Sequence, residues 1–267
     1  MELGTLCKQV IEVAEKTGEF IYNEVPKIKA ANVESKSLHN FVTYVDKTSE
    51  AKLVEALTKL LPEAGFIAEE GTSTKKGDRF NWIIDPLDGT TNFIHGLPPF
   101  AISIALMDNE ELIIGVVHEV VSKETFYAWK GSAAYLNGKE IHVSTAARVK
   151  DSLIATGFPY TDFDKLRPFM LTLEHLFNQS HGVRRLGSAS VDMAYLACGR
   201  FEGFYEYGLS PWDVAAAALI IRQAGGKITD FNGGENYIFG REIICGAPGM
   251  FSELYQLIHR IMNNLPA

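Results

Sequence analysis

Two aspartates at the end of an apolar segment are the first residues whose spacing could do chemistry. Residues 82–93 read WIIDPLDGTTNF, so Asp85 and Asp88 are three positions apart with no basic side chain between them. Pro86 lacks a backbone N–H and bends the chain, while Gly89 permits a tight turn. Carboxylates this close repel each other unless a cation lies between them, and hard oxygen ligands favour Mg²⁺ or a similar ion. The segment therefore predicts a metal site at the end of a strand.

Taken alone, this pair could equally be a helix cap and a turn residue, but two further acidic positions favour the metal site. Glu69 and Glu70 end another apolar stretch, and Asp213 begins a helix of small uncharged residues at 214–218. A helix this apolar is expected in the interior, so its N-terminus would point into a cleft. These carboxylates, together with the first pair, could hold two ions about 4 Å apart, an arrangement that positions a water for in-line phosphoryl displacement.

The first half of the chain, residues 1–150, is predicted to be an antiparallel sheet that carries helices. Apolar residues at helical spacing predict helices at 5–23 and 49–61. Turn signals such as Asn137-Gly138, a strong hairpin signal, separate several strand-like apolar runs. These runs are residues 82–84, 101–107, 112–121, 125–129 and 141–143.

Strands and helices alternate in the second half, residues 151–267, which predicts an α/β arrangement. The expected strands are residues 153–156, 183–186, 201–205, 227–229 and 243–245. The expected helices are residues 164–178, 188–198, 211–223 and 251–265. Because no Pro-, Gly- or Ser-rich linker separates the halves, we expect two subdomains in one compact unit. The first would carry the main acidic motif, and the second would complete the site.

Composition excludes several classes of protein. The chain has 267 residues, of which 46% are hydrophobic and 22% charged, which is typical of a globular protein rather than a disordered one. A net charge of −8 argues against direct binding to nucleic acid or to an anionic membrane. Three scattered cysteines form neither a disulfide framework nor a thiolate zinc site. With no leader-like segment and no long apolar run, a soluble cytoplasmic protein is expected.

Together these segments resemble the inositol monophosphatase family. Residues 85–93 and residues 212–226 look like its two signatures, and Glu69-Glu70 stands where the family has an acidic pair. The similarity extends along essentially the whole chain. It implies an α+β protein built as a layered α/β/α/β/α sandwich, and a homodimer. It also implies Mg²⁺-dependent hydrolysis of a small phosphate monoester, usually inhibited by lithium, by a water that the metal activates.

The resemblance also implies which residues bind the metal. Two or three Mg²⁺ ions would be bound by four carboxylates and one backbone carbonyl, with Asp85 bridging two of the ions. The implied ligands are Glu69, Asp85, the Leu87 carbonyl, Asp88 and Asp213.

The same resemblance implies catalytic and substrate-binding roles. Thr90 would orient the attacking water with its hydroxyl polarised by Asp46, and the N–H groups of Gly89 and Thr90 would bind the phosphate. The polyol hydroxyls would be bound by Glu206, the Ala189 backbone and Asp88. From the sequence alone, Asp46 could also be an ordinary helix cap, and Glu206 a solvated residue at a strand end.

myo-Inositol 1-phosphate is the leading substrate, and several related esters stay open. Residues 209–211 and the pair Arg184-Arg185 look like bacterial members of the family, and they change the pocket for the leaving group. Related folds handle fructose 1,6-bisphosphate, histidinol phosphate, 3′-phosphoadenosine 5′-phosphate and nicotinamide dinucleotide phosphates. Some bacterial members also bind transcription machinery, so a regulatory protein-binding role is the alternative from a different class.

Overall fold

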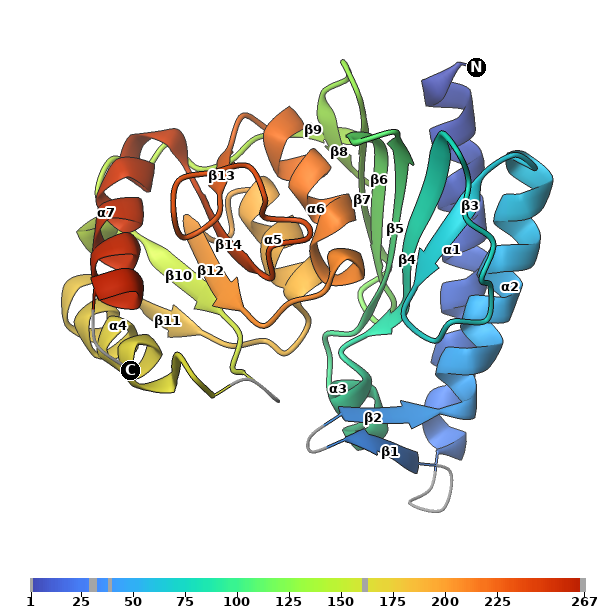
Figure 1. Ribbon diagram of the computed structural model, residues 1–267, viewed down its shortest axis with the longest axis horizontal. Coiled ribbons are helices and arrows are strands. Elements are labelled where there is room, and N and C mark those ends of the chain that lie inside the picture. The colour runs from blue at the N-terminus through green and yellow to red at the C-terminus, as the bar shows by residue number, and fades with distance from the viewer. Residues whose placement is uncertain (1, 29–32, 38–39, 160–162, 265–267) are drawn as a thin grey trace.

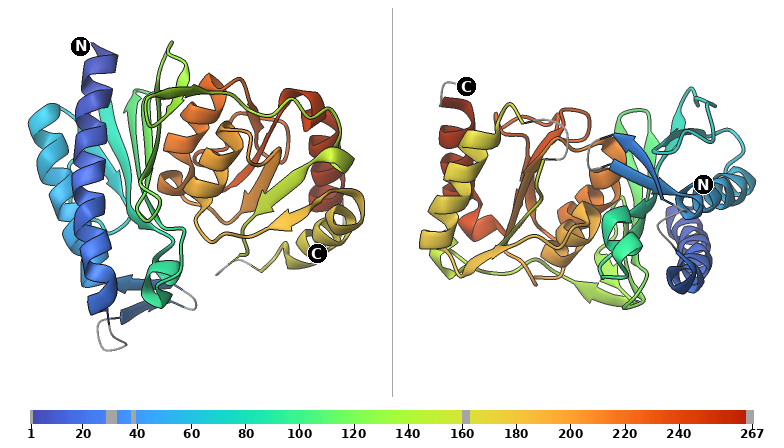
Figure 2. Two further views of the ribbon diagram at one scale, coloured as in Figure 1. Left: turned by 180° about the vertical axis from the view of Figure 1, so that it is seen from behind. Right: turned by 90° about the horizontal axis from the view of Figure 1, so that it is seen from below.

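The computed structural model describes residues 2–28, 33–37, 40–159 and 163–264. Its layers follow one another as helices, sheet, helices, sheet and helices (Figure 1). Figure 2 shows from two further sides that one pair of helices lies between the two large sheets. The sequence-based expectation of an α+β layered sandwich is confirmed. Within the described ranges, no helix has both the length and the apolar character needed to cross a bilayer.

The larger sheet holds seven strands in chain order. They are β3 (Gly65–Ala68), β4 (Phe80–Asp88), β5 (Ala101–Asp108), β6 (Glu111–Glu119), β7 (Glu124–Trp129), β8 (Ala134–Leu136) and β9 (Lys139–Ile141). Neighbouring strands from β4 to β9 pair antiparallel, as predicted. The edge strand β3 pairs parallel with β4, a pair that the sequence analysis did not predict. Asn137 and Gly138 both have positive φ, so β9 begins directly after this turn at Lys139, earlier than expected.

Two helices, α1 (Leu3–Glu24) and α2 (Tyr44–Leu60), cover the outer face of this sheet. α1 lies close to its expected position and buries an apolar face that includes Leu6 and Val10. α2 begins at Tyr44 rather than near residue 49, because Thr43 and Asp46 form a capping box at its N-terminus. The short η1 helix (Val25–Lys27) and the hairpin of β1 (Val33–Ser37) and β2 (Asn40–Thr43) connect α1 to α2 and were not predicted.

The smaller sheet has the strand order β11-β10-β12-β14-β13. Its strands are β10 (Leu153–Thr156), β11 (Gly182–Arg184), β12 (Gly203–Tyr207), β13 (Lys227–Thr229) and β14 (Glu242–Gly246). β10 runs parallel to β11 and β12, whereas β14 is antiparallel to both of its neighbours. The η3 helix (Val149–Asp151) precedes this sheet. The expected alternation of strands and helices in the second half is therefore present.

Two helices, α4 (Leu166–Gln179) and α7 (Pro248–Asn264), cover the outer face of the smaller sheet, while α5 (Ala189–Ala197) and α6 (Pro211–Gln223) form the middle layer (Figure 1). The small residues of α6 allow very close packing against the larger sheet. A Cβ added at Gly115 in β6 would lie 2.4 Å from the carbonyl oxygen of Ala216. Because α6 packs this closely, its N-terminus is held at the end of the larger sheet, where β4 turns into α3 (Thr90–His95).

Candidate active site

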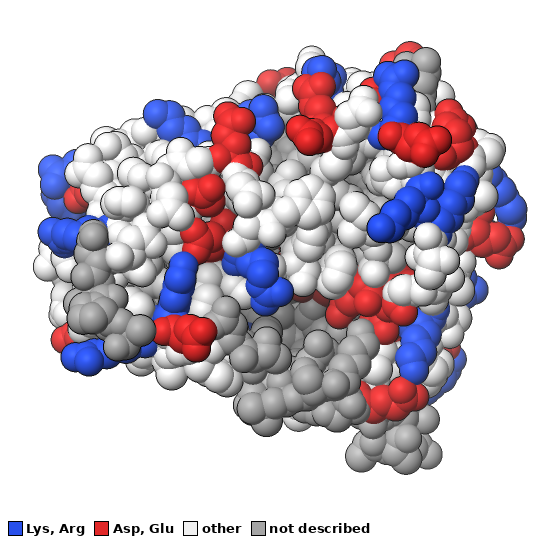
Figure 3. Space-filling view, in the orientation of Figure 1, with Lys and Arg blue, Asp and Glu red and all other residues white. Residues whose placement is uncertain are grey.

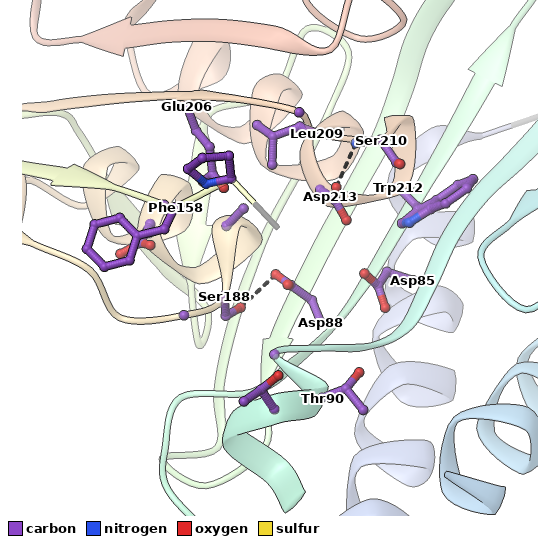
Figure 4. Close-up of a pocket in the computed structure, with 18 of the residues that line it drawn as sticks. Asp85, Asp88, Thr90, Phe158, Ser188, Glu206, Leu209, Ser210, Trp212 and Asp213 are labelled. Carbon is purple, nitrogen blue, oxygen red and sulfur yellow. Dashed lines mark hydrogen bonds between the residues drawn. The ribbon is translucent and has the colours of Figure 1, made fainter. Parts of the chain in front are cut away.

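Three aspartates meet where β4 ends and α6 begins. Asp85 and Asp88 belong to the last residues of β4, and Asp213 lies in the first turn of α6. Their side chains point toward one another (Figure 4). One carboxylate oxygen from each aspartate lies within 4.8 Å of one from each of the others. Such a set of hard anionic oxygens matches the ligands that Mg²⁺ prefers.

An irregularity in β4 brings both of its aspartates to the same cavity. Residues three apart in a regular strand would face opposite sides of the sheet. The pairing of β4 with β5 shifts register between Asp85 and Asp88, and the backbone N–H of Leu87 donates to Asp85 Oδ1 at 2.9 Å. Pro86, which has no N–H to donate, lies inside this shift. The bulge therefore turns Asp88 toward the same side as Asp85.

Asp88 is oriented by the beginning of α5. Its Oδ2 accepts hydrogen bonds from Ser188 Oγ at 2.6 Å, from the Ser190 N–H at 2.8 Å and from Ser190 Oγ at 2.5 Å. Three donors therefore fix Oδ2 of Asp88, and this also fixes the direction in which its Oδ1 points. Neither serine was predicted as a site residue from the sequence, although Ser188 at the start of a predicted helix had the signal of an N-cap.

Burial and like charges raise the pKa values of this cluster. The pKa of Asp85 lies well above its ordinary value because the group is buried and because Glu69, Asp88 and Asp213 place negative charge around it. Burial and the charge of Asp88 also raise the pKa of Asp213, and burial raises that of Asp88. A bound cation relieves this kind of repulsion, so the residues present fit a divalent metal.

One cavity of about 320 Å³ contains nearly all of the residues that the sequence analysis singled out. Among the residues given a metal-binding, catalytic or substrate-binding role, Asp46 lies outside its lining. The others line it together: Glu69, Asp85, Leu87, Asp88, Gly89, Thr90, Ala189, Glu206 and Asp213. The two halves of the chain therefore contribute to a single cavity.

Asp46 lies behind this cavity, in contact with Thr90. Its side chain is 1% exposed, and its Oδ1 lies 3.0 Å from Thr90 Oγ1. Its Oδ2 accepts from the Thr43 N–H at 2.8 Å and from Thr43 Oγ1 at 2.6 Å. Burial raises the pKa of Asp46, while these hydrogen bonds lower it. Asp46 thus caps α2, as the helix-cap interpretation expects. It also makes the contact with Thr90 that the catalytic interpretation needs.

Gly89 makes the turn from β4 into α3 possible. It has a φ of 90°, and a Cβ at this position would lie 3.0 Å from the carbonyl oxygen of Pro99. Both observations favour glycine, because other residues rarely adopt this conformation and a Cβ here would be in tight contact with the backbone of Pro99. α3 begins at the next residue, Thr90, and no side chain caps it. Gly89, Thr90 and Thr91 line the cavity, so the start of α3 lies at its edge.

The opposite end of the cavity combines two carboxylates with one guanidinium. Glu206 in β12 is 6% exposed, so it is not the solvated strand-end residue of the alternative interpretation. Burial, with Asp192 as the next cause, raises the pKa of Glu206 well above its ordinary value, and Arg185 partly offsets this. The Arg185 guanidinium lies 5.5 Å from the ring centre of Phe158. A Cβ at Gly157 would lie 2.0 Å from Glu206 Oε1, so the backbone approaches this carboxylate closely.

Charged groups alternate in sign on the face of the molecule shown in Figure 3. Lysine and arginine side chains lie among aspartates and glutamates, and the described residues on this face form no continuous basic patch. This distribution agrees with the acidic net charge of the whole chain.

Comparison with known proteins identifies the family of the chain. A model of the inositol monophosphatase family matches residues 2–264. The chain belongs to the inositol monophosphatase family. This membership confirms the resemblance stated above and supports a phosphatase activity on this fold. The family is Mg²⁺-dependent in general, and the three clustered aspartates could hold a metal.

Individual members of the family are similar along most of their length. The chain is 39% identical to the Nus factor SuhB of Pseudomonas aeruginosa over 253 residues, 93% of each protein. It is 36% identical to an inositol-1-monophosphatase of Rhizobium meliloti over 261 residues, 97% of this chain and 98% of that protein. Among solved structures, an IMPase of Thermotoga maritima has a TM-score of 0.86 and 36% identity, covering 94% of this chain and 95% of the other.

Proposed function

We propose that this protein is a Mg²⁺-dependent phosphatase whose leading substrate is myo-inositol 1-phosphate. One observation carries the proposal: a single cavity joins three clustered aspartates to the Thr90–Asp46 contact on one side and to Glu206 on the other. Membership of the inositol monophosphatase family supports the same activity. The two halves of the chain would act as subdomains that complete one site between them.

The carboxylates of the cavity would hold two or three Mg²⁺ ions. The ligands would be the Leu87 carbonyl and four side chains, those of Glu69, Asp85, Asp88 and Asp213. When bound, Mg²⁺ offsets the charge of the phosphate dianion and lowers the pKa of a water. The hydrogen bonds from Ser188 and Ser190 would keep the second oxygen of Asp88 directed at the cluster.

Thr90 and Asp46 would orient the attacking water. A hydroxyl has one proton, and Thr90 Oγ1 lies 3.0 Å from Asp46 Oδ1 and also 3.0 Å from the Leu87 carbonyl oxygen. Donation to Asp46 leaves the lone pairs of Thr90 Oγ1 to accept a proton of the water, which fixes the direction of attack. The N–H groups of Gly89 and Thr90 would bind the phosphate oxygens.

The opposite end of the cavity favours an uncharged polyol as the leaving group. Glu206 and Asp192 place two carboxylates there against one guanidinium from Arg185. The other cavity arginine, Arg241, lowers the pKa of Asp213 and so acts near the aspartate cluster. Hydroxyl groups can donate to Glu206, whereas a second phosphate would face excess negative charge. Glu206, the Ala189 backbone and Asp88 would therefore bind inositol hydroxyls in preference to a bisphosphate.

A panel of phosphate esters tests this proposal. Phosphate release is measured with and without Mg²⁺ on inositol 1-phosphate, fructose 1,6-bisphosphate, histidinol phosphate, 3′-phosphoadenosine 5′-phosphate and a nicotinamide dinucleotide phosphate. The proposal predicts Mg²⁺-dependent release with the highest kcat/KM for inositol 1-phosphate. A preference for a bisphosphate or a nucleotide would contradict the proposed substrate but not the Mg²⁺-dependent hydrolysis. No release from any ester would contradict the enzymatic proposal.

A regulatory protein-binding role is the second candidate function. It is favoured by the 39% identity to a protein named Nus factor SuhB. Capture of a stable protein partner from the native cell by the tagged, catalytically silent Asp88→Asn variant would support it, and failure to capture any would count against it.

The proposal also includes a cytoplasmic homodimer inhibited by lithium. Light scattering would check the dimer, and Li⁺ titration of the activity would check the inhibition.

A further inference from the structure

Helix α2 carries two buried carboxylates one turn apart. One contacts Thr90 in the cavity lining, and the other contacts the segment that directly follows Glu69. Asp46 and Glu50 are separated by four residues, so they lie on the same helix face. Both belong to the interior, with Glu50 0% exposed. Asp46 contacts Thr90, as described above. The proposed function assigns no role to Glu50.

Glu50 binds the chain segment directly after Glu69. Its Oε2 accepts from the Glu70 N–H at 2.7 Å. Its Oε1 accepts from the N–H and the hydroxyl of Thr72, each at 2.7 Å. A buried carboxylate is costly unless it is fully hydrogen-bonded, and short bonds of this kind to an ionised acceptor are stronger than those between neutral groups. Glu50 therefore holds residues 70–72 firmly against α2.

The position of Glu69 depends on this attachment because its own strand ends just before it. The pairing of β3 with β4 ends at Ala68, and the next contact, from the Glu69 N–H to the Ile84 carbonyl oxygen, has lengthened to 3.4 Å. Gly71 then turns the chain with a φ of 67°. Glu69 is thus fixed on one side by the end of the sheet and on the other side by Glu50.

We propose that Glu50 is a positioning residue that sets Glu69 for Mg²⁺ binding. α2 then aligns two parts of the site from one rigid face, Thr90 through Asp46 and Glu69 through Glu50. The inference rests on the proposed function, because it takes Glu69 as a metal ligand. Partners of metal ligands usually contribute about 10- to 100-fold to metal affinity or to activity.

A matched control separates positioning from simple stabilisation. Glu119 is also a buried carboxylate that holds a turn, because it accepts from both the N–H and the hydroxyl of Ser122. That turn, between β6 and β7, contributes no residue to the cavity lining. The test uses Glu50→Gln, which keeps the size of the side chain, and Glu119→Gln as its control. Thr72→Val removes one of the three bonds and keeps the charge of Glu50.

Three measurements are made on each purified full-length variant. They are the Kd of Mg²⁺ by isothermal titration calorimetry without substrate, the kcat and KM for inositol 1-phosphate, and the unfolding midpoint without Mg²⁺. We expect Glu50→Gln to weaken Mg²⁺ binding and to lower kcat by about 10- to 100-fold each. Thr72→Val should change both in the same direction by less. Glu119→Gln should lower the unfolding midpoint and leave the Kd and kcat as in the wild type.

Two results would overturn the inference. One is a Glu50→Gln protein with the Kd and kcat of the wild type, and the other is an equal loss in Glu119→Gln. If Glu50→Gln does not fold, Thr72→Val decides, and an unchanged Kd in that variant rejects the role. A wild-type protein that binds Mg²⁺ but hydrolyses no ester refutes the proposed function, while the Kd comparison still decides whether Glu50 positions Glu69. A wild-type protein that binds no Mg²⁺ refutes both.

Discussion

The hydroxyl of Thr90 lies 3.0 Å from a carboxylate oxygen of Asp46, although 44 positions separate the two residues in the chain. Thr90 faces the cavity, and Asp46 is buried behind it and held by Thr43. Such a pair can orient a water only while both members are present, because Asp46 acts through the Thr90 hydroxyl.

This dependence predicts non-additive losses. Thr90→Ala and Asp46→Asn should each lower kcat by about 10²-fold, the size of the loss when a reacting group is misplaced. KM should change little. The double variant should be no worse than the poorer single variant, since both changes remove the same oriented water. Initial rates of phosphate release by the wild type, both single variants and the double variant complete the double-mutant cycle. If the fold-losses in kcat of the two single variants multiply in the double variant, the residues act independently.

Asp213→Asn should keep the stability of the metal-free protein and lose metal binding. Asparagine keeps the size of the side chain and can still accept from the Ser210 N–H, but it removes one charge from a buried repulsive cluster. The metal-free variant should therefore unfold at the same temperature as the wild type or a higher one. Its turnover should fall at least about 10²-fold, because metal ligands supply several kcal/mol of transition-state stabilisation.

Thermal unfolding with and without Mg²⁺ checks this prediction. Mg²⁺ at about 100 times its Kd should stabilise the wild type by about 2.7 kcal/mol. The same concentration should leave the unfolding temperature of Asp213→Asn nearly unchanged. A variant that responds to Mg²⁺ as the wild type does would remove Asp213 from the ligand set.

Gly115→Ala should weaken the metal site from a distance. The added methyl would meet the Ala216 carbonyl at 2.4 Å, so α6 must move away from β6 and take Asp213 with it. We expect a loss of about 1–3 kcal/mol in the free energy of unfolding, together with weaker Mg²⁺ binding. Gly18→Ala is the control, because its methyl would meet the His118 ring at 2.6 Å, on the α1 side of the sheet. Urea unfolding and Mg²⁺ titration should show that the control loses stability alone.

His118 should make the protein sensitive to mild acid. It is buried in β6, with Nδ1 2.9 Å from Thr125 Oγ1, and Thr125 Oγ1 lies 3.2 Å from Glu15 Oε1. Burial, with a smaller effect of Lys123, lowers the pKa of His118 from 6.5 to about 4. Below pH 6.5 His118 becomes protonated in the unfolded chain but stays neutral in the folded protein. The free energy of unfolding therefore falls between pH 6.5 and about pH 4.

The expected slope is up to about 1.4 kcal/mol of unfolding free energy per pH unit, the effect of one proton. It should vanish above this range. Urea unfolding of the wild type and of His118→Gln across the range isolates the histidine from the carboxylates that titrate in both proteins. Parallel stability curves for the two proteins would contradict the prediction.

The sequence was sufficient for the long elements and for the acidic motifs. α1 and α6 have clear apolar patterns, and the spacing of Asp85 and Asp88 identified the turn at the end of β4. β1, β2 and β3 were missed because strands of four or five residues, some of them mostly polar, give too little periodicity to recognise.

Contacts between segments far apart in the chain could not be predicted from local sequence patterns. Ser190 binds Asp88 across 102 positions, and Glu50 binds Thr72 across 22 positions, so no local signal marks either pair. Glu206 could be taken for a solvated residue because the expected strand ends at Tyr205, whereas β12 continues to Tyr207 and is buried along its whole length.

The most direct test of the central claim is phosphate release from myo-inositol 1-phosphate, measured with and without Mg²⁺ on the wild type and on Asp88→Asn. We expect release by the wild type only when Mg²⁺ is present, and no release by an Asp88→Asn protein that keeps its fold. Release without metal, or full activity of Asp88→Asn, would contradict this claim.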